Sequence, residues 1–165
     1  MSLTVKGLAK LTGTLTKTFD QGDGSFPASI GTPLELSDGT DADQADLIFA
    51  DTRSTTGEDL DLAGTLSDAF GDTITMARVK AIFVKASSDN TVDVHVGGAA
   101  SNALDTIFAD TTDKAVVRPG GALMFWAPDA TAYAVTASTA DLLTVAASDG
   151  ATSVSYDIVI IGASA

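Results

Sequence analysis

Residues 79–97 read VKAIFVKASSDNTVDVHVG, and this stretch decides the fold class. In its second half, valines alternate with Asp93 and His95, the period of two that is typical of a half-buried strand. Its first half is apolar and rich in β-branched and aromatic residues, which favours a second strand. The polar residues between the halves predict a loop, so we expect residues 79–97 to form a β-hairpin.

The same alternation recurs toward the C-terminus. From residue 73 onward, apolar segments separated by Asp, Ser, Thr and Gly predict about seven or eight strands at spacings of about 8–12 residues. The segment 154–161 is apolar enough for a central strand. A short strand over 104–110 and one helical turn over 66–71 are also expected. The prediction is an all-β chain in which residues 46–165 form a single β-sandwich or jelly-roll-like domain.

Residues 1–45 are predicted to be an N-terminal arm followed by an acidic loop. The Thr and Gly residues between positions 12 and 18 disfavour a helix, so we expect an extended, strand-rich arm. Residues 26–33 are predicted to be irregular, because Pro27 and Pro33 exclude a central strand.

The arm carries too many apolar side chains to remain exposed to solvent. The sandwich is nevertheless expected to fold from about residue 45 without the arm. We therefore predict that residues 1–19 pack against a neighbouring chain. Among the aromatic residues, core packing of both Phe125 and Trp126 is favoured, and a role for one of them as a ligand platform or an interface anchor stays open. The predicted interface residues are Leu3, Val5, Lys6, Leu8, Lys10, Leu11, Leu15 and Trp126.

The net charge of −13 opposes binding to nucleic-acid backbones. The charge is uneven, because residues 1–17 carry three lysines and no acid, net +3, whereas residues 18–77 carry thirteen acids against Arg53, net −12. No apolar run approaches the roughly 20 residues that span a bilayer, and the N-terminus lacks the apolar core of a signal peptide. No membrane partner is expected.

The acidic loop at residues 37–46 is a candidate calcium site. An EF-hand loop beginning at Asp41 would place Ala45, Asp46 and Thr52 where a ligand, a glycine and a glutamate are needed, so the pattern fails. A solvated loop is the favoured interpretation, and a calcium site of another type stays open. The absence of cysteine and the single histidine exclude cysteine-based zinc sites and multi-histidine sites within one chain. No metal or cofactor is predicted.

Two pairs of side chains are candidate catalytic groups. Asp59 and Asp61 resemble the carboxylate pair of a glycosidase, but their alternation with leucines places them on the wet face of a strand. Asp93 and His95 lie about 6.5–7 Å apart along one strand, which is too far for Asp93 to orient the imidazole. No Gly-x-Ser-x-Gly motif is present. No catalytic residue is predicted, and the chain is not expected to be an enzyme.

Seven segments between residues 45 and 163 form a set. They are DLIF at 46–49 with Arg53, EDLDLAG at 58–64, LSDAFG at 66–71, VKAI at 79–82, VRPGG at 117–121, AYAVT at 132–136 and YDIVIIG at 156–162. Together they resemble a family of small structural proteins from the virions of tailed bacteriophages and prophages, of the decoration or tail-accessory type. The resemblance implies a virion component with no catalytic residues.

On this basis we expect a capsid decoration (cement) protein, trimeric, bound to the major capsid protein on the outer surface of the virion after synthesis in the host cytoplasm. The alternative is a tail, baseplate or head-fibre component that binds a glycan of the host surface. A third, less favoured hypothesis is a glycan hydrolase.

Overall fold

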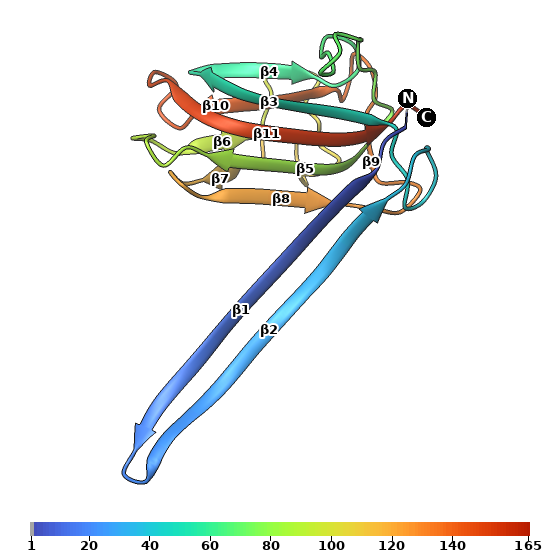
Figure 1. The fold of residues 1–165 in the computed structure, drawn as a ribbon. Coiled ribbons are helices and arrows are strands. Elements are labelled where there is room, and N and C mark those ends of the chain that lie inside the picture. The colour runs from blue at the N-terminus through green and yellow to red at the C-terminus, as the bar shows by residue number, and fades with distance from the viewer. Residues whose placement is uncertain (1) are drawn as a thin grey trace.

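The computed structural model describes residues 2–165. These residues form strands joined by loops, with no helix among them (Figure 1). The all-β prediction is therefore confirmed. Met1, which belongs to the predicted arm, lies outside the described residues. The strands are β1 (Val5–Phe19), β2 (Gly22–Leu36), β3 (Leu47–Thr55), β4 (Gly57–Asp61), β5 (Arg78–Ala86), β6 (Val94–Val96), β7 (Ala115–Val117), β8 (Ala122–Trp126), β9 (Tyr133–Ala134), β10 (Leu142–Ala147) and β11 (Val154–Ala163).

Two antiparallel sheets pack face to face into a sandwich. One sheet has the order β3-β11-β5-β8, with β9 also pairing with β5, and the other has the order β4-β10-β6-β7. Side chains of both sheets meet in one core, because alternate residues of each strand point inward. Examples are Ile158 and Ile160 of the first sheet and Leu143 and Val145 of the second, each at most 1 % exposed.

Strand β11 is central, as its apolar sequence predicts. It pairs with β3 on one side and with β5 on the other. Its register on β5 shifts between Ile161 and Gly162. A Cβ atom on Gly162 would lie 2.6 Å from Met76 Sδ and 2.8 Å from the carbonyl oxygen of Arg78, so this close approach requires glycine.

The predicted hairpin over residues 79–97 is wrong, because β5 and β6 belong to different sheets. The segment between them crosses from one sheet to the other. The side chain of Asn90 fixes this crossing by donating to the carbonyl oxygen of Ser155 at 2.9 Å and accepting from its N–H at 2.8 Å. A period of two shows which side chains of a strand point inward. The same period occurs in the two strands of a hairpin and in strands of opposing sheets, so it does not identify the partner of a strand.

Two smaller predictions are also wrong. Residues 66–71 contain no helical turn, because Asp68 Oδ1 accepts hydrogen bonds from the N–H groups of Phe70 and Asp72 at 2.8 and 2.9 Å and closes a local turn instead. Residues 104–110 contain no strand. Their apolar residues reach the core from a loop, in which the N–H of Leu104 donates to the carbonyl oxygen of Leu142 at 2.9 Å.

Strands β1 and β2 form a separate two-stranded hairpin that projects from one end of the sandwich, beside the chain termini (Figure 1). They pair continuously from Val5–Leu36 to Phe19–Gly22. Fifteen residues that rise about 3.4 Å each give a hairpin about 50 Å long.

Residues 26–33, predicted to be irregular, lie in strand β2, and that prediction is wrong. Both strands of a two-stranded sheet are edges, and an edge strand tolerates proline when its nitrogen faces away from the partner strand. Pro27 and Pro33 exclude a central position, and β2 does not occupy one.

Candidate interaction surface

The two faces of the hairpin differ in chemistry. Directly paired residues of an antiparallel sheet point to the same face, so odd-numbered residues of β1 share a face with even-numbered residues of β2. We call this the apolar face, and it consists of Val5, Gly7, Ala9, Leu11, Gly13, Leu15, Lys17, Phe19, Gly22, Gly24, Phe26, Ala28, Ile30, Thr32, Leu34 and Leu36. The opposite, polar face consists of Lys6, Leu8, Lys10, Thr12, Thr14, Thr16, Thr18, Asp23, Ser25, Pro27, Ser29, Gly31, Pro33 and Glu35.

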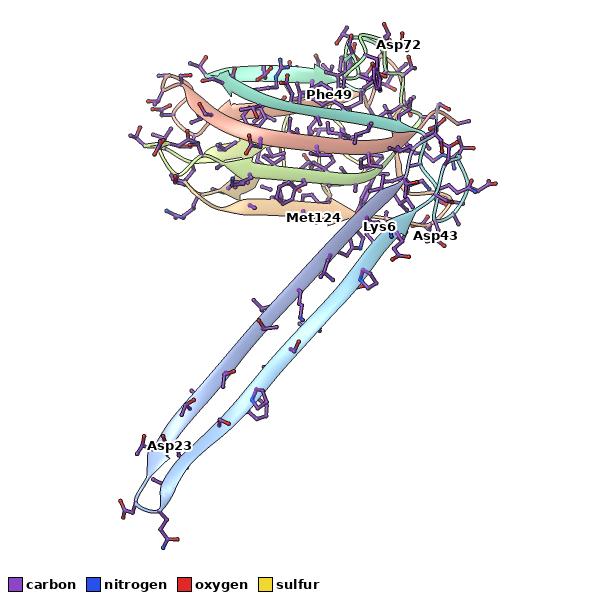
Figure 2. All side chains as sticks on the ribbon, in the orientation of Figure 1. Lys6, Asp23, Asp43, Phe49, Asp72 and Met124 are labelled. Carbon is purple, nitrogen blue, oxygen red and sulfur yellow. The ribbon has the colours of Figure 1, made fainter. Side chains whose placement is uncertain are left out.

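At the root of the hairpin, the apolar face covers part of the sandwich. Leu34 and Leu36 are 3 % and 2 % exposed and form a small second core with Ala45, Ala81 and Ile161. A Cβ atom on Gly7 of β1 would lie 3.4 Å from Met124 Cε of β8, a residue that Figure 2 labels at this junction. The half-buried residues that pack against this second core are Leu3, Val5, Met124, Trp126 and Val159.

Beyond the root, the apolar face is uncovered. Its large side chains are Leu11, Leu15, Phe19, Phe26 and Ile30, which are 75, 72, 55, 68 and 75 % exposed. A contiguous exposed apolar surface of this kind marks an interaction site in a folded protein. The exposed stripe continues the second core outward, so the same face is buried at one end and uncovered at the other.

The predicted interface residues fall into three places. Leu3, Val5 and Trp126 are half-buried against their own chain at the root. Leu11 and Leu15 lie on the exposed part of the apolar face. The remaining three, Lys6, Leu8 and Lys10, lie on the polar face.

The sequence analysis missed Phe26 and Ile30, which pair directly with Leu15 and Leu11. A signal for them exists, since every even position from Phe26 to Leu36 except Thr32 is apolar, which is the period of a strand. Pro27 and Pro33 lie within this segment and favour irregular backbone.

The charge of the hairpin differs from that of the sandwich. Residues 1–36 carry three lysines and three acids, net zero, so residues 37–165, with six basic and nineteen acidic residues, carry the whole −13. On the apolar face the one charged residue is Lys17, whose ammonium lies 5.2 Å from the centroid of the Phe19 ring. Two copies of the chain therefore repel through their sandwiches and not through their hairpins.

The acidic loop after β2 is tied to the sandwich beside the root. Lys80 is fully buried, and its ammonium donates to the carbonyl oxygens of Asp41 at 3.1 Å and Asp129 at 2.5 Å. Burial lowers the pKa of Lys80, and the neighbouring charge of Arg78 lowers it further. The N–H of Asp43 donates to the carbonyl oxygen of Pro128 at 2.7 Å. Among residues 2–165, no group of three or more His, Cys, Asp or Glu side chains is placed to hold a metal ion.

A second polar cluster joins β3, β4 and β11. The hydroxyl of Tyr156 donates to Glu58 Oε1 at 2.9 Å, and Arg53 Nε donates to Glu58 Oε2 at 2.8 Å. Burial, followed by this hydrogen bond, raises the pKa of Tyr156 above its ordinary range. The hydrogen bond to Glu58 raises the pKa of Arg53, so the guanidinium stays charged. All three polar groups are paired with one another, which is the arrangement of a structural link between strands.

Comparison of the chain with protein-family models, with curated proteins and with solved structures gives no match. The described residues 2–165 contain no helix long and apolar enough to cross a membrane. The resemblance to phage virion proteins stays a prediction.

Proposed function

We propose that this chain is a non-enzymatic structural protein of a tailed-phage virion, a capsid decoration protein that binds the major capsid protein on the outer surface of the head. The observation that carries the proposal is the exposed apolar face of the hairpin, which extends over a length of about 50 Å from a well-packed sandwich. An element of this shape reaches beyond its own domain and gains stability only when another surface covers it.

The energy available to such a contact is substantial. Burying a large apolar side chain completely contributes about 1.5–3 kcal/mol. Five side chains that are 55–75 % exposed therefore offer about 5–10 kcal/mol per chain, before the costs of association are subtracted. The hairpin is already paired along its length, which reduces the cost of ordering it on assembly. Repeated over many copies, this gain would reinforce a shell.

Two further observations support the proposal. The acidic sandwich, with all of the net charge, suits an outward-facing domain that stays hydrated and repels other particles. The seven segments that resemble phage virion proteins lie in this sandwich.

The test is the copy number of this chain in purified particles of the phage or prophage that encodes it, measured by gel densitometry against the major capsid protein. Decoration predicts on the order of hundreds of copies per particle. A few to tens of copies would assign the chain to the tail, baseplate or head fibre instead. Its absence from particles would overturn the virion proposal altogether.

A further inference from the structure

We infer that the apolar face of the hairpin is covered by the same face of hairpins from further copies of this chain. The hairpins then form a central bundle, and the acidic sandwiches stand apart around it. This inference rests on the proposed structural role, in which the exposed face needs a covering surface, and it names that surface as further copies of the chain and not the capsid protein. Three properties of the hairpin favour a second copy: its surface relief, its charge and its edges.

The relief of the apolar face is complementary to itself. Large and small residue pairs alternate along it, and successive pairs are about 7 Å apart because each step is two residues of a strand. Two shallow depressions flank one large pair, the first lined by residues 9–11 and 30–32 and the second by residues 11–13 and 28–30. Large side chains of one copy can fill the small positions of another, as in well-packed sheet interfaces. The large pairs are Leu11–Ile30 and Leu15–Phe26, and the small pairs are Ala9–Thr32 and Gly13–Ala28.

The position of Gly13 makes this relief specific. A Cβ atom on Gly13 would meet no other atom within 4 Å, so nothing in the chain itself fills the space above it. On the next large pair toward the tip, Leu15 and Phe26 are 72 and 68 % exposed. A small residue beside large exposed ones leaves a recess of the size that a leucine or isoleucine side chain of another copy occupies.

Charge directs the contact to the hairpins. Each sandwich carries about the full −13 of its chain, whereas residues 1–36 are neutral. Copies that met through their sandwiches would place like charges together, which disfavours association. Copies that meet through the middles of their hairpins bring the uncharged apolar-face residues of 9–15 and 26–32 into contact and leave the acidic sandwiches in solvent. Lys17, the one charged residue of the apolar face, lies nearer the tip.

The edge of the hairpin argues for contact through the face and against strand addition at β2. Proline has no backbone N–H, so within a paired strand Pro27 and Pro33 direct their nitrogens away from β1, toward the open edge. That edge lacks two of the donors an added strand would need, which is a known protection against edge pairing.

The area decides how many copies are expected. The uncovered part of the face runs from Ala9 to Phe19 of β1 and is therefore about 37 Å long, about 10 Å wide and about 370 Å² in area. Two such faces in contact bury about 740 Å², which is below the roughly 1,000 Å² of a specific interface, whereas three bury about 1,100 Å². Three hairpins with their apolar faces toward a common axis let each face contact two others, so we expect a trimer.

The experiment measures the mass of the purified full-length chain by light scattering after gel filtration, in the absence of virions. The chain of 16.7 kDa is expected to elute at about three times that mass. The variant Leu15→Asp should reduce the mass to that of a monomer. Its matched control is Thr16→Asp, which places the same charge at the adjacent position. This position lies on the polar face, so the oligomer should stay intact.

A third variant distinguishes specific side-chain packing from non-specific hydrophobic association. Gly13→Leu adds an apolar side chain into open space, so the hairpin of the single chain tolerates it while the recess for the partner is filled. We expect a monomer with an unchanged circular dichroism spectrum. A patch that is merely adhesive would associate more strongly with this variant, and that result would overturn the inference.

Two other outcomes also overturn the inference. One is a monomer for the unchanged chain at about 100 μM, because a dissociation constant of that size corresponds to only about 5.5 kcal/mol of association free energy. The other is an oligomer that Thr16→Asp disrupts as strongly as Leu15→Asp. A dimer that responds to the three variants as described supports the contact between hairpins. Because no virion is present, failure here leaves the decoration role standing, and the copy number in particles tests that role separately.

Discussion

Shortening the hairpin should leave the stability of the sandwich almost unchanged. The change replaces residues 10–31 by Asn-Gly, a two-residue turn that closes the existing Ala9–Thr32 pair. The removed residues contribute no side chain to either core. The retained root keeps Val5, Leu34 and Leu36 in place.

The expected change in the free energy of unfolding follows from how little the removed residues are buried. Removal of exposed residues away from the core should change the free energy of unfolding by less than about 1 kcal/mol. For a domain of this size, that is a shift in Tm of less than about 4 °C. By contrast, Leu36→Ala removes a side chain that is 2 % exposed and should cost about 2–5 kcal/mol.

The assay is thermal and urea unfolding followed by circular dichroism. Gly13→Leu serves as the full-length reference, because association between hairpins would otherwise add to the apparent stability. If shortening lowers the free energy of unfolding as much as Leu36→Ala does, the hairpin is an integral part of the sandwich core and the reasoning is refuted.

Two further predictions concern the sandwich. The pKa of Tyr156 is raised above its ordinary value of 10.0 by burial and by the hydrogen bond to Glu58. Its contribution to stability is therefore complete below about pH 10 and is lost as pH rises further, so Tyr156→Phe should flatten the decline of the unfolding free energy above pH 10. An unchanged slope in alkaline urea titrations would contradict this role. Gly162→Ala should destabilise the sandwich by about 1–3 kcal/mol, because its Cβ would overlap Met76 and the backbone of Arg78. Unchanged urea unfolding would show that this junction relaxes freely.

The sequence predicts some strands well because their own side chains specify them. Strand β11 is one, since its apolar run matches only a position with neighbours on both sides. The partner of a strand is a different matter. Residues 79–86 and 92–96 have the pattern of a hairpin, yet a crossing loop held by Asn90 sends them to opposite sheets.

The sequence predicts only part of the candidate surface. It indicates Leu11 and Leu15, because they belong to a strand-rich segment with several leucines that the sandwich does not bury. It does not indicate Phe26 and Ile30, because the prolines around them favour irregular backbone. Only the register of β1 against β2 brings the four side chains onto one face, and register depends on where the turn falls.

The most direct test of the structural role is the occupancy of virions by the shortened chain. The gene in the phage or prophage is replaced by the version in which Asn-Gly substitutes for residues 10–31, and particles are compared by gel densitometry with those carrying the full chain. We expect abundant full-length chain on particles. The shortened chain should fold in the host but be at least about tenfold less abundant on particles, since about 5–10 kcal/mol of apolar burial is removed. Equal occupancy by the shortened chain would contradict the role assigned to the hairpin.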